Sequence, residues 1–98
     1  MGLQHVVLFR FNDTASEEQI GALSAGLDAL STKIDVIRFY SHGRDARVRA
    51  GTWDYGIVAE FDSVDDFHTY RDHPEHQALI RDLVEPITVE RAAVQFAR

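Results

Sequence analysis

The sequence predicts a single α+β domain in which a four-stranded antiparallel sheet carries its helices on one face. Two observations indicate this class. Apolar residues alternate with period two in four short segments, and they recur at helical spacing in the segments between them. The order is strand, helix, strand, strand, helix, strand, which is the split βαβ plan. Right-handed crossovers place both helical regions on the same face of such a sheet.

The first strand and first helix occupy residues 4–31. Residues 4–11 alternate as a strand does, and one face carries His5, Val7, Phe9 and Phe11. Residues 17–31 repeat isoleucine and leucine at helical spacing. Ser16 and Gln19 fit a capping box at the helix start, because each side chain can bond the backbone of the other residue. We therefore expect a helix that buries one side.

The second and third strands are expected at residues 35–42 and 53–61, joined by an arginine-rich loop. Alternation in the third strand places Trp53 and Tyr55 on one face, together with Ile57, Ala59 and Phe61. The loop carries Arg44, Arg47 and Arg49. These side chains could bind a phosphate or a carboxylate, but a solvated loop is the simpler interpretation, and Asp45 partly offsets their charge.

Two further helices and a last strand complete the chain. Ser63 can cap the second helix, which stops at His73 because Pro74 disfavours helical geometry in the residue before it. Pro74 suits the first position of a third helix, which we expect to end near Pro86. Residues 88–96 read as the last strand.

Composition excludes several classes of function. Sixteen acidic residues against ten basic ones give a net charge of −6, the wrong sign for binding nucleic acid or an anionic membrane surface. The absence of cysteine excludes disulfides, thiolate catalysis and thiolate metal sites. No signal peptide or membrane span is evident, so we expect a cytoplasmic protein. No glycine-rich phosphate loop is present, and we expect no cofactor.

The second face of the sheet predicts self-association. Val6 and Leu8 lie on the face of the first strand opposite to His5. If both helical regions cover one face, the other leaves an apolar surface larger than a soluble monomer normally exposes. Packing of two sheets across a two-fold axis would cover it. We expect a homodimer through this face.

A histidine and a tyrosine are the candidate catalytic pair. His76 lies on the apolar face of the third helix, and an imidazole there can accept or give a proton near neutral pH. Tyr70 could hydrogen-bond a carbonyl or an oxyanion nearby. His5, Trp53, Tyr55 and His73 are the candidate substrate-binding residues.

Structural roles for these histidines stay open beside the functional ones. His76 could be a core histidine bonded to backbone, His5 could be structural, and His73 could cap the third helix. His68 is expected to face solvent and His42 to end a strand. A metal site formed by His73, His76 and His5 is not expected, because the chain turns at Pro74 and no carboxylate supplies a further ligand.

The chain resembles the stress-responsive A/B barrel (Dabb) family over nearly its whole length. The resemblance is carried by three segments: His5-Val6-Val7-Leu8-Phe9-Arg10-Phe11, Phe61-Asp62-Ser63 before a helix, and Tyr70-Arg71-Asp72-His73-Pro74-Glu75-His76. It implies a ferredoxin-like protomer in a dimeric α+β barrel, with a pocket between helices and sheet in each protomer.

One plant branch of that family, the olivetolic acid cyclases, performs a cofactor-free aldol cyclisation of a linear polyketide. The resemblance implies that its catalytic tyrosine and histidine match Tyr70 and His76, and that His5 matches a pocket histidine. A further pocket histidine is replaced in this chain, with Tyr55 the expected occupant. That difference argues against the same substrate.

Three functions follow from these observations. The first is a small-molecule pocket protein, for a largely apolar phenolic or carbonyl ligand, that acts as a cofactor-independent cyclase or lyase. The second is a non-catalytic stress-responsive protein. The third is a cofactor-free monooxygenase, which rests on fold analogy alone. An apolar pocket suits both enzymatic functions, so the sequence does not separate them.

Overall fold

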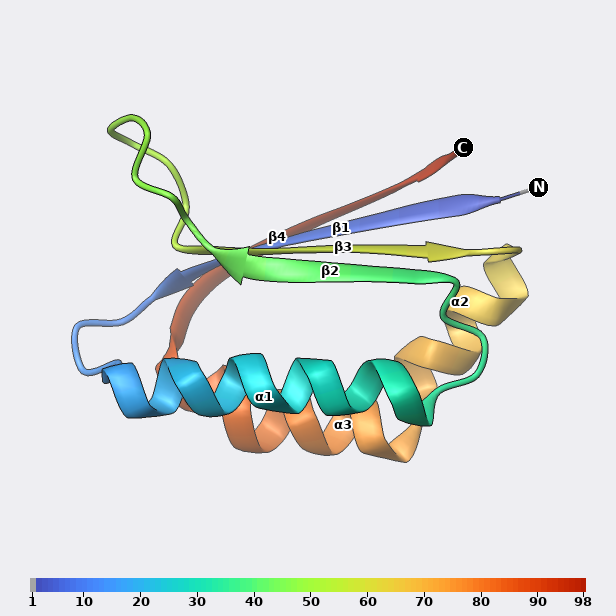
Figure 1. Cartoon of the computed structure of the whole chain (residues 1–98), viewed down its shortest axis with the longest axis horizontal. Helices are drawn as coiled ribbons and strands as arrows, with labels where there is room; N and C mark the ends of the chain where they lie inside the picture. Colours follow the sequence, from blue (N-terminus) through green and yellow to red (C-terminus); the bar gives the residue numbers. More distant parts are fainter. Residues whose placement is uncertain (1) are drawn as a thin grey trace.

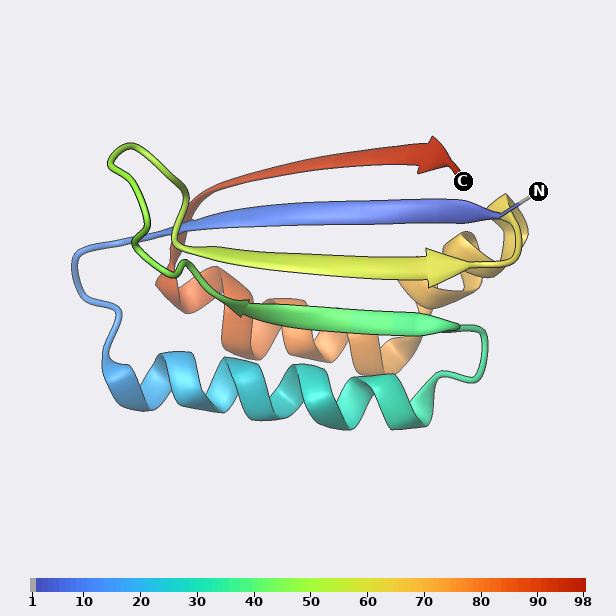
Figure 2. The same ribbon diagram turned by 45° about the horizontal axis from the view of Figure 1, so that its top comes forward.

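The computed structural model describes residues 2–98 and confirms the predicted four-stranded antiparallel sheet with helices on one face (Figure 1). The strands lie in the order β2-β3-β1-β4, which Figure 2 shows most clearly. In chain order the elements are β1 (Leu3–Phe11), α1 (Glu17–Lys33), β2 (Phe39–Arg44), β3 (Tyr55–Phe61), α2 (Val64–Asp72), α3 (Pro74–Leu79), η1 (Ile80–Val84), η2 (Glu85–Ile87) and β4 (Thr88–Ala97).

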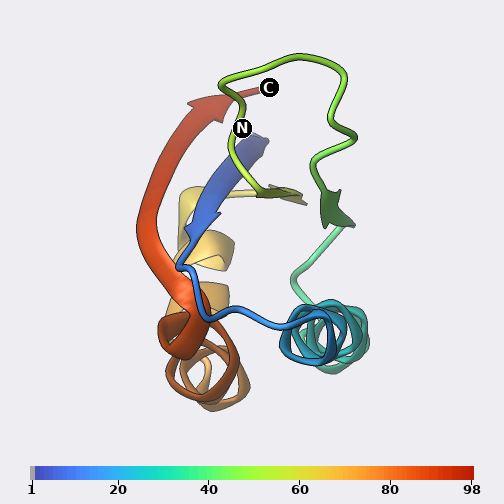
Figure 3. The same ribbon diagram turned by 90° about the vertical axis from the view of Figure 1, so that its left-hand side faces the viewer.

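The capping box predicted for α1 is present. The Gln19 backbone N–H donates to the Ser16 hydroxyl at 3.1 Å, and the Ser16 N–H donates to the Gln19 side-chain oxygen at 3.0 Å. Both bonds satisfy donors that a helix N-terminus leaves free. The apolar stripe of α1 is buried against the sheet. Figure 3 shows α1 and α3 end-on beneath the strands.

The segment after α2 turns sharply and then changes its helical type. His73 has extended backbone angles, and Pro74 opens α3 as the sequence predicts. The expected single helix ending near Pro86 is more complex in the structure. The Glu85 N–H donates to the Ile80 carbonyl five residues earlier, so η1 is a π-helical turn, and η2 is a 3-10 turn. Such insertions are frequent at functional sites.

Two strand boundaries differ from the prediction. β2 begins at Phe39 rather than at residue 35, because a turn bonds the Ile37 N–H to the Ile34 carbonyl. β3 begins at Tyr55, since the Asp54 N–H bonds the Phe9 carbonyl, out of the β1–β3 register that pairs Phe9 with Tyr55. The alternation predicted from Trp53 therefore does not apply, and Trp53 does not share the buried face of Tyr55. His42 lies within β2 rather than at a strand end.

The core fills the space between the helices and one face of the sheet. Its buried members from β3 alternate, so that Tyr55, Ile57, Ala59 and Phe61 all face the helices. The opposite face has no covering layer among residues 2–98, as Figure 3 shows. It is this uncovered face that carries Val6 and Leu8, as the strand pattern predicted.

Candidate functional site

An apolar cavity of about 200 Å³ lies between the helix face of the sheet and the helices α2, α3 and η1. Its floor comes from β1, β3 and β4, and its roof from the helices. The lining residues are His5, Val7, Phe9, Leu27, Ile57, Phe67, Tyr70, Arg71, His76, Leu79, Ile80, Val84, Arg91 and Ala93. The structure therefore brings together three predicted site residues, which are His5, Tyr70 and His76.

The alternation of β1 aims His5 at this cavity. His5 is only 7% exposed, and its ring centre lies 4.8 Å from that of Phe67. The Gln95 side-chain amide donates to His5 Nδ1 at 2.9 Å, from the neighbouring strand β4. Because Nδ1 accepts this bond, the proton of the neutral ring sits on Nε2. Burial lowers the pKa of His5 to about 4, helped by His76, so the ring is neutral at pH 7.

His76 has the opposite hydrogen-bonding pattern. Its Nδ1 lies 3.0 Å from the Arg71 carbonyl oxygen. A carbonyl can only accept, so Nδ1 carries the proton and Nε2 keeps a free lone pair. Burial lowers the pKa of His76; the bond to Arg71 raises it, and the nearby Arg91 charge lowers it. His76 is therefore held in its neutral, proton-accepting form.

Neither Nε2 atom has a hydrogen-bond partner within residues 2–98. Both atoms are accessible, since Thr88 Oγ1 is the one side-chain nitrogen or oxygen of this part of the chain that is both buried and unbonded. The cavity thus offers one imidazole donor, from His5, and one imidazole acceptor, from His76. That pair can hold an oxygen atom and remove a proton from its neighbourhood.

Tyr70 completes this group from the end of α2. Its ring centre lies 4.3 Å from that of His76 and 6.1 Å from that of His5. Its hydroxyl lies 2.8 Å from the Tyr40 hydroxyl of β2. Burial raises the pKa of Tyr70 to about 12, and burial also raises the pKa of Tyr40. Both phenols stay protonated. The bond between the two hydroxyls uses the proton of only one of them, so the other hydroxyl can donate its proton to a different acceptor.

Three predicted site residues lie away from this cavity. His73 Nδ1 accepts from the Glu75 N–H at 3.1 Å, so His73 caps α3. The Tyr55 hydroxyl lies 2.8 Å from His42 Nδ1, and His42 Nε2 lies 2.7 Å from the Asp28 carboxylate. The Trp53 ring lies under the Arg10 guanidinium at 4.3 Å.

Trp53 also lines a second, larger cavity of about 640 Å³. This cavity opens between the loop after β2 and the uncovered face of the sheet, where Leu8 and Gly56 lie opposite each other. Side-chain hydrogen bonds hold the loop in place. The Arg47 guanidinium donates to the Asp54 carboxylate at 2.8 Å, and the Thr52 hydroxyl donates to the Asp45 carboxylate at 2.8 Å.

Sequence reasoning missed Tyr40, Gln95 and Arg91. Tyr40 lies in a predicted strand with no mark of function, and it meets Tyr70 only through packing of β2 against α2. Gln95 and Arg91 enter through the register of β4 on β1, which pairs Gln95 with His5 and Arg91 with Phe9. Their period-two spacing along β4 was the one signal available.

No group of three or more histidine and carboxylate side chains in the described part of the chain is arranged to hold a metal ion. His73 and His76 direct their Nδ1 atoms to different backbone groups, which separates the pair considered from sequence. None of the helices within residues 2–98 combines the length and the apolar character that crossing a membrane requires.

The fold and cavity define a ferredoxin-like α+β protein with a histidine-lined pocket under its sheet. Residues 3–97 match the sequence model of the stress responsive A/B barrel domain, Dabb, and the chain belongs to that family.

Relatives of known sequence and structure agree with this assignment. A dimeric ferredoxin-like protein of unknown function from Thermobifida fusca is 38% identical, with a TM-score of 0.93 over 100% of this chain and 92% of that one. Hydroxynitrile lyase from Passiflora edulis is 19% identical, with a TM-score of 0.84 over 97% of this chain and 91% of that one, and shares the fold. A stress-response A/B barrel domain-containing protein of Arabidopsis thaliana is 24% identical over 96% of this chain, which spans only 36% of that longer protein.

Proposed function

We propose that the 200 Å³ cavity binds a small, largely apolar ligand with a carbonyl or phenolic oxygen, and that His76 is the general base of a cofactor-independent lyase or cyclase reaction. The observation that carries the proposal is the pair of unbonded Nε2 atoms, one donor and one acceptor, in a single apolar cavity. Each ring uses its Nδ1 for a bond within the protein and leaves its Nε2 available to a ligand.

The cavity volume sets the size of the ligand. An engineered cavity of about 150 Å³ holds benzene, and pockets for drug-sized ligands begin near about 300 Å³. At about 200 Å³ this cavity suits one ring or a short branched chain. A long linear polyketide would not fit within it, so the size favours a small aldehyde, ketone or phenol.

The three polar groups divide the chemistry between them. His5 Nε2–H, and the Tyr70 hydroxyl when Tyr40 donates to it, hydrogen-bond the ligand oxygen and stabilise negative charge that develops there. His76 Nε2 takes a proton from the carbon or hydroxyl beside that oxygen. The bond from His76 Nδ1 to the Arg71 carbonyl fixes the tautomer and steadies the imidazolium that forms. The hydroxynitrile lyase of the same fold supports the view that this architecture can hold a lyase site.

The test compares ligand binding by the native protein with binding by His76→Ala. Small phenols and aromatic aldehydes would be screened by saturation-transfer NMR, with His68→Ala as the matched control because His68 does not line the cavity. We expect His76→Ala alone to weaken binding and to abolish any proton transfer from the ligand. If His76→Ala lowers stability while neither protein binds any probe, the histidine is structural and the non-catalytic stress-response role is favoured.

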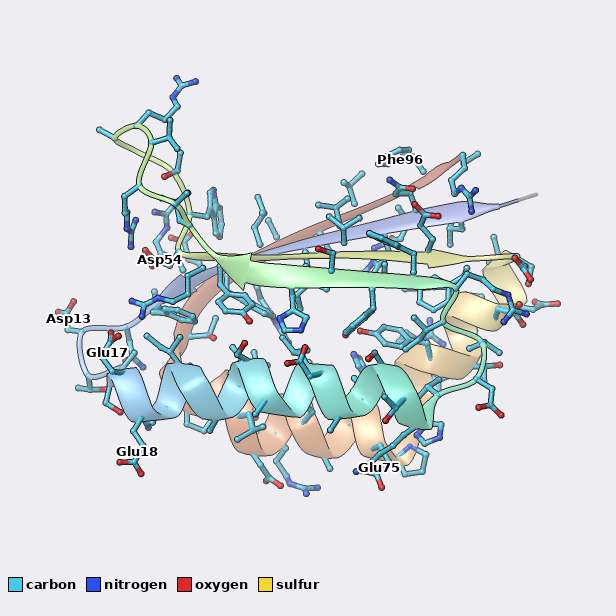
Figure 4. The ribbon with its side chains drawn as sticks, viewed as in Figure 1. Asp13, Glu17, Glu18, Asp54, Glu75 and Phe96 are labelled. Atoms are coloured by element: carbon cyan, nitrogen blue, oxygen red, sulfur yellow. The ribbon has the colours of Figure 1, made fainter. Side chains whose placement is uncertain are left out.

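We also propose that the chain forms a homodimer through the uncovered face of its sheet. Phe39, Val94 and Phe96 are 48%, 53% and 48% exposed, and strand register puts all three on this face. Figure 4 shows Phe96 on the side of the sheet away from the helices. The Thermobifida fusca relative supports the proposal, since that protein is dimeric.

Light scattering at micromolar concentration tests the dimer. Phe96→Asp should shift the protein to a monomer, because it would bury a carboxylate in an apolar interface. Val48→Asp, on the loop and 86% exposed, is the control and should leave the mass unchanged. A native protein of monomer mass would refute the proposed dimer and leave the proposed function of the cavity unaffected.

A further inference from the structure

The basic side chains of this acidic protein are almost all paired with carboxylates. Of its ten lysine and arginine residues, eight make an ion pair within residues 2–98. They are Arg10, Lys33, Arg38, Arg44, Arg47, Arg71, Arg81 and Arg98. The two that make none in this described part of the chain are Arg49, on the loop after β2, and Arg91, on β4.

Arg91 stands at the edge of the candidate site. It lies opposite Phe9 in the β1–β4 ladder, on the same side of the sheet as Ala93 and Gln95. Its side chain lines the apolar cavity together with His76. The charge is close enough to His76 to contribute to the lowered pKa of that ring. No aspartate or glutamate lines the cavity, and the other lining arginine, Arg71, already holds Asp72 through two hydrogen bonds.

We propose that Arg91 binds the carboxylate of the ligand, which makes the ligand a small carboxylic acid with an apolar body. This inference rests on the proposed function of the cavity and names its substrate class. The planar guanidinium matches a carboxylate with two parallel hydrogen bonds. A single exposed arginine with no helix N-terminus beside it suits a carboxylate better than a phosphate dianion, which normally meets several donors.

The arrangement gives the ligand a direction. Its carboxylate lies at the exposed end of the cavity on Arg91, its apolar body lies against the side chains beneath the sheet, and its oxygen reaches His5 and His76. Arg91 therefore acts by positioning the ligand. The proposed dimer leaves it free, because Arg91 faces the helix side of the sheet and Phe96 the other.

Benzoate and benzamide are a matched pair of probes, equal in size and different in charge. Their dissociation constants would be measured by NMR titration at low salt for the native protein, Arg91→Gln and Arg49→Gln. We expect the native protein to prefer benzoate by about three- to tenfold, the range for an exposed to partly shielded charged hydrogen bond. Arg91→Gln should abolish the preference. Arg49→Gln removes the other unpaired charge and should keep the preference.

The possible failures are distinguishable. If both probes bind the native protein equally and compete with neutral aldehydes, the cavity is a ligand site but the carboxylate assignment is wrong. If Arg49→Gln removes the preference as fully as Arg91→Gln does, long-range charge explains it and the assignment is also wrong. If neither probe nor any neutral aldehyde or phenol binds, both the proposed ligand-binding function and the carboxylate assignment are wrong. Arg91→Lys keeps the positive charge but loses the planar guanidinium that makes two parallel hydrogen bonds, so it should retain only part of the preference for benzoate.

Discussion

Acidification from about pH 7 to pH 5 should destabilise this protein through His5. The ring has its ordinary pKa of 6.5 in the unfolded chain and a pKa of about 4 in the folded protein. The unfolded state therefore binds more protons than the folded state between these two pH values. The contribution of His5 to the free energy of unfolding is thus fully present above pH 6.5 and is lost as the pH drops toward 4. A shift of this size corresponds to about 2 kcal/mol lost between pH 7 and pH 5, and about 3 kcal/mol at pH 4. Burial of His76 acts in the same direction.

Urea unfolding at pH 7 and pH 5, at one protein concentration, measures this loss. His5→Gln removes the titrating ring while keeping a polar side chain beside Gln95, so its loss on acidification should be smaller than the native loss by about 2 kcal/mol. His68→Gln, from outside the cavity, is the control and should lose as much as the native protein. His5 is not the source of the acid sensitivity if His5→Gln keeps the full native loss, or if an NMR titration places the His5 pKa near the ordinary value of 6.5.

Two further predictions concern packing and hydrogen bonding. Gly21→Ala should stabilise α1 by about 1 kcal/mol, because the added Cβ meets open space. Gly26→Ala should stabilise the helix less, because its added Cβ would lie 2.7 Å from Leu83 Cδ1. Thermal unfolding of the two variants would show which is the more stable. Tyr40→Phe should cost about 1–3 kcal/mol by leaving the buried Tyr70 hydroxyl unpaired. The double change of Tyr40 and Tyr70 to phenylalanine should cost less than the two single changes added together, and an additive result would show that the two hydroxyls do not interact.

Local sequence patterns were sufficient for most of the fold. The capping box at Ser16, the break at Pro74 and the alternation of β1 depend on residues a few positions apart, whose backbone preferences act over the same short range. The patterns failed where a tertiary contact decides. At Asp54 a bond to the distant Phe9 carbonyl delays β3, and alternation alone could not place Trp53. After Leu79 the same helical pattern is compatible with α or π geometry.

The candidate site shows the same division between local and distant determinants. The sequence alone determined that His5 points to the buried side of its strand and that His76 lies on the inner side of its helix, because strand and helix periods fix those directions. Packing between distant elements is what places both rings in one cavity, bonds Tyr70 to Tyr40 and lets Gln95 set the His5 tautomer. These contacts join elements up to 90 residues apart, and strand register and helix packing, which no local pattern encodes, bring their side chains within hydrogen-bonding distance.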